Sequence, residues 1–381
     1  MKILFTFFNP SGGMETLNRI RSNALKDHGI ESHLLYNIDG EGRQNIKDIR
    51  TIVTSDSDTI RNLIEQEKYD AVIVCSDIHM LVQIRSFGYG GRLIFEFQGL
   101  GTPEEATQIL QNFKDPINRH ADALLYPRTA HLRRLMRSFF PDIQQYCFDD
   151  PLDCKNFGYT AYPQKAYPII GWIGRIQANK NWREFLQMGQ RLIRLHPGLS
   201  LWLFDDDTLS DSAELTGYHQ ILEADPLLSS RLFRYSNIPH ELMADYLSII
   251  GDSGGLLVST SIREGFGYAV AEAMLCRCPV LSTDSGGVRR FIFHNRTGKF
   301  YTRGNLDEAV KEALSLMINI PLRNRLIQSA EMHIHKHFSA DLYAEHFIAM
   351  LYRLDAVPST FPAHKGKEQQ RPNDDANENQ S

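Results

Sequence analysis

The sequence lacks an apolar stretch long enough to cross a membrane. Its longest apolar run, Ile3–Phe8, has the length of a strand, whereas a membrane-spanning helix needs roughly 18 apolar residues. Met1 and Lys2 lead directly into that run, without the small-residue cleavage site of a secretory signal peptide. We therefore expect a cytoplasmic protein.

Cysteine is scarce, and an excess of positive charge is absent. The five cysteines are few and odd in number, and Cys276 and Cys278 lack the spacing of metal ligands. No histidine cluster completes a metal site, so we expect reduced thiols and no bound metal. The formal net charge of −5 gives no electrostatic argument for nucleic-acid binding.

The length of 381 residues and the ordinary composition indicate a globular chain of two domains. In the first half, strand-like and helix-like segments alternate, which is typical of parallel α/β sheets. The expected strands are Ile3–Phe8, His33–Tyr36, Ala71–Cys75, Leu93–Phe97 and Ala123–Tyr126. The expected helices are Met14–Asp27, Asp58–Gln66, Ile78–Ser86, Pro103–Asn112 and Ala130–Phe140.

A segment without periodicity, Asp149–Tyr167, separates this half from a second alternating set, so we predict domains at residues 1–160 and 161–339. The second set comprises strands Pro168–Ile173, Leu201–Phe204, Leu232–Tyr235, Gly255–Ser259 and Pro279–Thr283, and helices Asn181–Leu195, Glu241–Ile249, Gly267–Leu275, Leu306–Met317 and Pro321–His335. We expect a final helix, residues 340–355, to pack back on the first domain. The polar residues 358–381 are predicted to be disordered and to carry no chemistry.

The most informative motif is Glu264-Gly-Phe-Gly followed by Glu272. An apolar strand precedes it and helix-forming residues follow, so it reads as strand, glycine turn and helix. In open α/β sheets, ligands bind at the carboxyl ends of strands, against helix N-termini. Carboxylates only accept hydrogen bonds, which suits the hydroxyl groups of sugars. The alternative is a pair of solvated glutamates on an amphipathic helix.

Two cations, Arg175 and Lys180, follow the first strand of the second domain and precede a helix. Cations beside a helix N-terminus make an anion site, and a diphosphate is the natural occupant. Such charges would stabilise the negative charge that grows on a departing phosphate. The alternative is two solvated basic residues.

Two further glycine turns, Gly12-Gly13 and Gly286-Gly287, also follow strands. Neither the G-x-G-x-x-G fingerprint nor the Gly-Lys-Ser/Thr of a P-loop is present, which argues against a nicotinamide dehydrogenase. Glycine turns at the strand ends of two domains predict a cleft between the domains. Ordinary βα turns are the alternative.

In this order the motifs G-R-x4-K, E-G-F-G-x4-E, P-V-x5-G-G and T-G resemble glycosyltransferase family 4 (group 1). The resemblance covers roughly residues 1–355 and is strongest in the second domain. It implies a retaining, nucleotide-sugar-dependent glycosyltransferase of the GT-B fold, in which two Rossmann-like domains with parallel sheets face each other across a cleft.

The resemblance also implies residue roles. Arg175 and Lys180 would hold the donor diphosphate, Glu264 would bind the donor sugar, and Glu272 would bind the ribose. Backbone groups complete the site: those of Phe266 and Gly267 meet sugar and phosphate, that of Ile238 meets the nucleobase, and Gly12-Gly13 resembles the family's first glycine turn. The departing phosphate would help to take the acceptor proton, and neither metal nor cofactor would be needed. The acceptor would carry a hydroxyl group on a small molecule, a glycan or a lipid-linked molecule.

The chain departs from the family pattern at three places. Gln98 stands where the family often has a histidine, and Asp205-Asp206-Asp207 replaces a glycine-rich turn. The family's Gly-Gly-x-x-Glu becomes Gly286-Gly287 followed by Val288, Arg289 and Arg290. The acidic turn invites a metal site, although an exposed turn is the preferred interpretation. Because glutamine cannot act as a base, a nucleotide-sugar epimerase or hydrolase of the same fold, or a non-catalytic sugar-nucleotide binding protein, is the alternative function.

The helix at residues 130–140 combines an apolar face with three arginines on another face. A core-packed helix with a solvated basic face is one interpretation. The other is peripheral contact with an anionic acceptor or with the inner face of the membrane.

Overall fold

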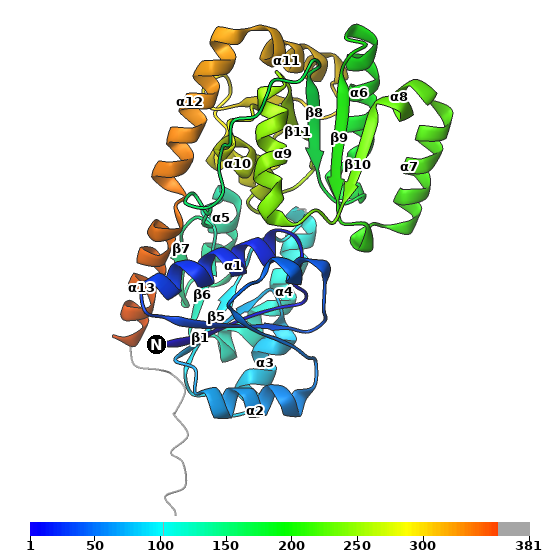
Figure 1. The fold of residues 1–381 in the computed structure, drawn as a ribbon. Helices are drawn as coiled ribbons and strands as arrows, with labels where there is room; N and C mark the ends of the chain where they lie inside the picture. The colour runs from blue at the N-terminus through cyan, green and yellow to red at the C-terminus, as the bar shows by residue number, and fades with distance from the viewer. Residues whose placement is uncertain (102, 357–381) are drawn as a thin grey trace, which may run out of the picture.

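The computed structural model describes residues 1–101 and 103–356, which form two domains stacked end to end (Figure 1). The strands of the first domain are β1 (Lys2–Phe7), β2 (Glu31–Tyr36), β3 (Arg50–Val53), β4 (Ala71–Cys75), β5 (Arg92–Glu96), β6 (Ala123–Tyr126) and β7 (Gln144–Cys147). They pair in parallel in the order β3-β2-β1-β4-β5-β6-β7. The order reverses at β1, and in such sheets the ligand cleft lies at that switch point.

Helices cover both faces of this sheet. They are α1 (Gly12–Asp27), α2 (Ser57–Glu67), α3 (Ile78–Ser86), α4 (Pro103–His120) and α5 (Ala130–Phe139), with the 3₁₀ turn η1 (Glu41–Asn45). One hydrophobic core joins the sheet to α2, α3, α4 and α5, and a second joins it to α1 and the last helix of the chain.

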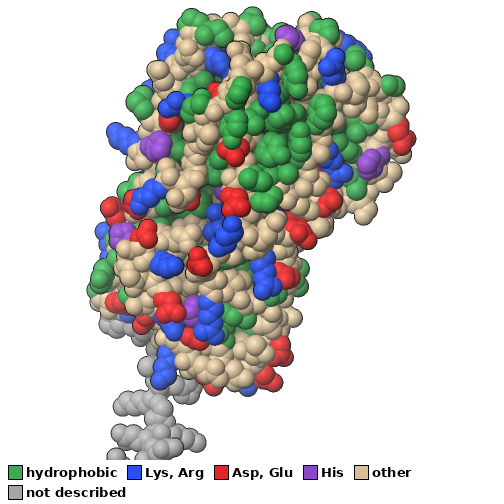
Figure 2. All heavy atoms as spheres, viewed as in Figure 1, with side chains coloured by type: hydrophobic (Ala, Val, Ile, Leu, Met, Phe, Trp, Pro, Cys, Tyr) green, Lys and Arg blue, Asp and Glu red, His purple; other side chains and the backbone are tan. Residues whose placement is uncertain are grey.

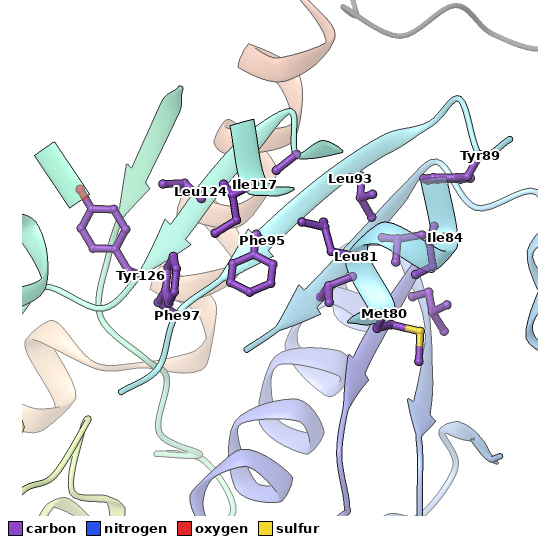
Figure 3. Close-up of a cluster of buried hydrophobic side chains, with 14 of the residues drawn as sticks. Met80, Leu81, Ile84, Tyr89, Leu93, Phe95, Phe97, Ile117, Leu124 and Tyr126 are labelled. Atoms are coloured by element: carbon purple, nitrogen blue, oxygen red, sulfur yellow. The ribbon is translucent and has the colours of Figure 1, made fainter. Parts of the chain in front are cut away.

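Strand β5 shows how the two faces are divided. Phe95 and Phe97 point into the core that also holds residues of α3 and α4 (Figure 3). Successive strand side chains alternate between faces, so Glu96 and Gln98 belong to the opposite face, which α1 covers. The alternation therefore carries a carboxylate to the α1 side of the sheet.

The second domain repeats the plan with six parallel strands in the order β10-β9-β8-β11-β12-β13. The strands are β8 (Ile169–Ile173), β9 (Ser200–Asp205), β10 (Leu232–Ser236), β11 (Leu256–Ser259), β12 (Val280–Thr283) and β13 (Lys299–Tyr301). The helices are α6 (Trp182–Leu195), α7 (Ser212–Ala224), α8 (Pro226–Arg231), α9 (His240–Asp252), α10 (Tyr268–Leu275), α11 (Leu306–Ile318) and α12 (Ile320–His337), with 3₁₀ turns at Ala178–Lys180, Asp207–Leu209 and Gly287–Arg290.

The chain crosses between the domains a second time at its end. Helix α12 runs down the second domain and α13 (Ala340–Asp355) lies on the first, as Figure 1 shows in orange and red. The buried face of α13 packs into the core beside α1, with Phe347 against Phe5.

Sequence patterns give the central elements but miss five others. These are the edge or near-edge elements β3, β7, β13, α7 and α8. Each of the three strands has three or four residues, too few to establish a hydrophobic period. Helix α4 runs past the predicted Asn112 to His120 although Pro116 lies within it. The tail at 358–381 lies outside the described residues.

Helix α5 buries Leu132 and Met136 and exposes Arg133, Arg134 and Arg137. The apolar face is therefore occupied by the core, which favours the solvated-face interpretation. No helix within residues 1–101 and 103–356 is both long enough and apolar enough to pass through a bilayer.

Candidate functional site

A cavity of about 500 Å³ lies between the two domains, a size typical of ligand pockets. Elements of both domains contribute to it, mainly at the carboxyl ends of their strands. All ten predicted site residues line the cavity: Gly12, Gly13, Gln98, Arg175, Lys180, Ile238, Glu264, Phe266, Gly267 and Glu272. Gly286 and Gly287 do not line it.

The turn from Glu264 to Gly267 is held from both sides. Gly287 N donates to Glu264 O over 3.1 Å, and Glu264 N donates to Ser285 O over 2.8 Å, so the Gly286-Gly287 turn supports the motif rather than the ligand. Across the cavity, a β-carbon at Gly265 would overlap the carbonyl oxygen of Gln98. At Gly265 the motif therefore approaches the first domain through its backbone.

Lys180 and Glu264 form an ion pair at the cavity wall, in which the Lys180 side chain is 19% exposed and that of Glu264 is 17% exposed. Ser261 Oγ donates to the same Glu264 oxygen over 2.7 Å. Thr260 Oγ1 donates to the backbone oxygen of Lys180 over 2.7 Å, which ties the lysine to the strand end that precedes the motif. The two residues thus present opposite charges at one place.

Arg175 lines the same cavity just beyond the end of β8, and its side chain is exposed. Among the described residues, no carboxylate lies within ion-pair distance of its guanidinium. Lys180 is paired with Glu264, whereas Arg175 presents an unpaired guanidinium to the cavity. A guanidinium in this position can bind a phosphate through two hydrogen bonds.

Glu272 lies on α10, one turn after its first residue, and is 7% exposed. Its Oε1 is 2.7 Å from Nε2 of His240, a cavity residue that sequence analysis missed. The His240 ring packs against the Phe157 ring in a tilted arrangement with centroids 4.8 Å apart, and His240 N donates to Asn45 Oδ1 of the first domain over 2.9 Å. His240 therefore fixes Glu272 and contacts both domains. Only its position after Pro239, at a helix start, could have indicated it.

A buried polar network of the first domain reaches the cavity through Gln98 and Asp150. Arg21 donates to both oxygens of Glu96, at 2.9 and 2.8 Å, and neither side chain is exposed by more than 1%. Gln98 Nε2 donates to Glu96 Oε1 over 2.9 Å and to Asp150 Oδ1 over 3.1 Å. Burial and the neighbouring Glu96 raise the pKa of Asp150 to about 8. A glutamate inside an apolar strand signals such a network, but Asp150 carries no comparable sequence signal.

Several buried polar atoms of cavity residues have no hydrogen-bond partner among the described residues. They are Ser11 Oγ, Asn237 Oδ1 and Tyr268 Oη. Buried polar groups are normally paired, so unpaired groups in residues that line a cavity mark the places where a ligand would supply the missing partner.

The acidic turn at 205–207 is exposed only in part: Asp207 is exposed and Asp206 is half-buried, as the sequence predicts, but the Asp205 side chain is not exposed. The Asp205 carboxylate accepts from Arg234, with the closest contact at 2.7 Å, and from Ser236 Oγ at 2.8 Å. Asp206 caps the following 3₁₀ turn. The carboxylates are engaged within the fold, and the described residues contain no group of three or more histidine, cysteine, aspartate or glutamate side chains that could hold a metal ion.

Residues 162–333 match the family model of the group 1 glycosyl transferases. These residues form a group 1 glycosyl transferase domain. The match contains Arg175, Lys180, Glu264 and Glu272, so the resemblance read from the motifs is confirmed for the second domain.

Solved structures resemble the whole fold around this glycosyl transferase domain. The sucrose-phosphate synthase of Thermosynechococcus elongatus superposes with a TM-score of 0.76 at 16% identity, over 93% of this chain and 99% of that one. HepE of Anabaena, in complex with UDP-glucose, gives 0.76 at 17% identity over 92% and 100%. The predicted GT-B fold is confirmed.

Among curated proteins, the sucrose synthase of Nitrosomonas europaea is 25% identical over 242 residues, which are 60% of this chain and 30% of that protein. The chain spans 30–50% of the length of the curated relatives it matches.

Proposed function

We propose that the protein is a retaining glycosyltransferase that moves a sugar from a nucleoside-diphosphate sugar to a hydroxyl acceptor without a metal ion. One observation carries this proposal: Arg175, Lys180, Glu264 and Glu272 line a single cavity between two domains. The glycosyl transferase domain supplies all four residues.

The charged residues of the cavity suit the parts of an elongated donor. Arg175 and Lys180 would bind the diphosphate and stabilise the charge that develops as the glycosyl bond breaks. Glu264 would accept hydrogen bonds from the sugar, while Glu272, held by His240, would accept from the ribose. The backbone groups of Phe266, Gly267 and Ile238 would meet the sugar, the phosphate and the nucleobase, with Gly12-Gly13 across the cavity.

From the ion pair between Lys180 and Glu264 we predict that removing either residue changes donor binding in a different way. Removing Lys180 takes away a cation and leaves Glu264 unpaired beside the phosphates, so both the nucleoside diphosphate and the nucleotide sugar should bind more weakly. Removing the charge of Glu264 frees Lys180, so diphosphate binding should persist while sugar binding weakens. A site that binds no donor would show neither pattern.

The test is calorimetry with UDP-, GDP-, ADP- and dTDP-glucose and with each nucleoside diphosphate alone. The comparison uses the nucleotide sugar that binds most tightly and its nucleoside diphosphate. Lys180→Ala should weaken the binding of both ligands by about tenfold or more, whereas Glu264→Gln should weaken the binding of the nucleotide sugar only. Lys114→Ala and Glu65→Gln, both on exposed helix faces, are matched controls. Unchanged affinity in Lys180→Ala would remove this lysine from the site.

Turnover separates a transferase from a non-catalytic binding protein and from an epimerase. The sugar released from the bound donor, to water or to an acceptor, should keep its anomeric configuration when followed by NMR. Inversion, epimerisation or binding without turnover would contradict retention or transfer.

A further inference from the structure

Asp150, in the loop after β7, is a buried acid that the proposed donor site does not yet include. Its side chain is 3% exposed, and it lines the cavity beside Gln98. Gln98 Nε2 donates to its Oδ1, and no described residue donates to or accepts from Oδ2. One oxygen of this buried acid is thus free to meet a ligand.

The position of the acid within the cavity follows from the glycine motif. The backbone of Gln98 touches Gly265, next to Glu264, so Gln98 and Asp150 face the part of the cavity where the donor sugar would lie. Tyr268, at the start of α10, also lines this region and has an unpaired hydroxyl. The acid and the glutamate of the motif therefore approach the sugar from opposite domains.

The charges around Asp150 favour its neutral form. Arg21 is already engaged by both oxygens of Glu96, and no described cation contacts the Asp150 carboxyl group. The remaining neighbours that influence it are Asp149, Cys75, Tyr268 and Tyr343, none of which is a cation. An ionised Asp150 would add a second buried negative charge beside Glu96, and this second charge would have no cationic partner. Burying an unpaired charge is costly.

The hydrogen bonds within this network show which atoms of Gln98 and Asp150 remain for a ligand. Gln98 uses one N–H group for Glu96 and the other for Asp150, which leaves its Oε1 as an acceptor. A neutral Asp150 keeps an O–H donor on Oδ2. A donor beside an acceptor matches hydroxyl groups of a sugar, since each hydroxyl both donates and accepts.

We propose that Asp150, as a neutral carboxylic acid, donates from Oδ2 to an oxygen of the donor sugar while Gln98 Oε1 accepts from a sugar hydroxyl. This inference rests on the proposed function. It assigns to the chain a sugar-binding pair where the family resemblance leads one to expect a histidine. Asp150 is a binding residue in this scheme and takes no proton from the acceptor.

The test compares Asp150→Asn, which stays neutral and keeps a donor and an acceptor, with Asp150→Ala, which keeps neither. Calorimetry would use UDP-glucose and UDP, or whichever glucose pair of the four binds best, at pH 6.5 and 9.5. At pH 6.5, Asp150→Ala should bind the nucleotide sugar about tenfold more weakly and the nucleoside diphosphate equally well. Asp150→Asn should bind both within about twofold of the wild type. The exposed Asp142→Asn is the matched control.

The pH dependence supplies a second measurement that needs only the wild type and Asp150→Asn. Burial and Glu96 raise the pKa of Asp150 to about 8, so raising the pH to 9.5 ionises the acid and removes the donor. Sugar-dependent affinity, taken as the ratio of nucleotide sugar to nucleoside diphosphate, should fall about tenfold in the wild type and stay flat in Asp150→Asn.

Each contrary result has a distinct meaning. If Asp150→Asn loses as much as Asp150→Ala, the ionised acid is needed, as for a base or a partner of an amine, and the inference is wrong. If neither variant changes sugar affinity while Lys180→Ala weakens both ligands, the inference fails and the proposed function stands. If none of the four pairs binds, both fail.

Discussion

At the scale of single residues, the Gln98 amide donates to two buried carboxyl groups, and only one of the two also contacts a cation. Arg21 balances Glu96, whereas Asp150 has only the Gln98 amide. Such an arrangement lowers stability at neutral pH if the acid must ionise, and it makes protonation part of the folded state.

This imbalance predicts a pH-dependent difference between the wild type and Asp150→Asn. The pKa of Asp150 is raised to about 8 in the folded protein by burial and Glu96, whereas unfolding returns it to about 4. Between these values the folded state binds one more proton, so wild-type stability falls as pH rises, by up to about 1.4 kcal/mol per unit. Chemical denaturation at pH 5, 6, 7 and 8 should show the stability of Asp150→Asn rising relative to the wild type. A constant difference would place the pKa of Asp150 near its ordinary value.

The acidic turn supports a second prediction at this scale. Because Asp205 is held by Arg234 and Asp206 caps a 3₁₀ turn, we expect the acidic turn not to bind a divalent metal. Chelation with EDTA should leave the rate of donor turnover within about twofold, since Arg175 and Lys180 supply the positive charge. Loss of turnover that added magnesium or manganese restores would return a metal to the mechanism.

Residue motifs predicted which side chains would meet, but not how they pair. Glu264, Glu272, Arg175 and Lys180 line one cavity as their positions at strand ends require. Their partners come from segments distant in sequence. His240 lies 32 residues before Glu272, and Asp150 lies 52 residues after Gln98, so only the folded chain brings each pair together.

At the scale of elements, the Glu264–Gly267 turn depends on close backbone packing rather than on side chains. Gly267, with φ of 96°, ends the turn and caps α10 in a conformation that favours glycine. The strands that the sequence failed to predict lie at the edges of the sheets, whereas the central strands were predicted to within two residues at each end. Long apolar periods specify the centre of a sheet better than its edges.

This packing predicts a strong effect of a single methyl group. In Gly265→Ala the new β-carbon would overlap the Gln98 carbonyl oxygen, so the turn or the domain contact must shift. Nucleotide-sugar affinity should fall about tenfold or more while the melting temperature of the second domain changes little. The control is Gly158→Ala, because a β-carbon there meets no atom within 4 Å. Equal affinities for the two variants would show that the turn tolerates displacement.

At the scale of the whole molecule, the two domains are joined by more than their linker. Arg290 binds Asp149 across the interface through bonds of 2.9 and 2.6 Å, and Lys47 binds Glu241 over 2.7 Å. Figure 2 shows positively and negatively charged side chains intermixed over both domains. The extra arginine that departs from the family pattern thus pairs with the other domain, a role that could not be predicted without the fold.

Helix α13 makes the first domain depend on the end of the chain. Its buried face contributes Phe347, which is fully buried with its ring centroid 5.7 Å from that of Phe5, and Tyr343, whose hydroxyl lies 3.5 Å from Arg21. The Phe5 ring in turn lies under the Arg21 guanidinium, 3.8 Å from it. The helix therefore covers both the core and the network that carries Glu96.

Phe347→Ala should therefore destabilise the first domain through a residue more than 300 positions from its first strand. Truncation of a buried phenylalanine costs about 3–5 kcal/mol because the cavity it leaves is only partly filled. Urea unfolding of the full chain should show an earlier transition, and at urea concentrations below it nucleoside-diphosphate binding to the second domain should persist. Tyr352→Ala on the same helix, where the side chain is 68% exposed, should leave the transition in place. If the two variants unfold alike, α13 does not stabilise the first domain, and the second crossing of the chain would serve only as a connection.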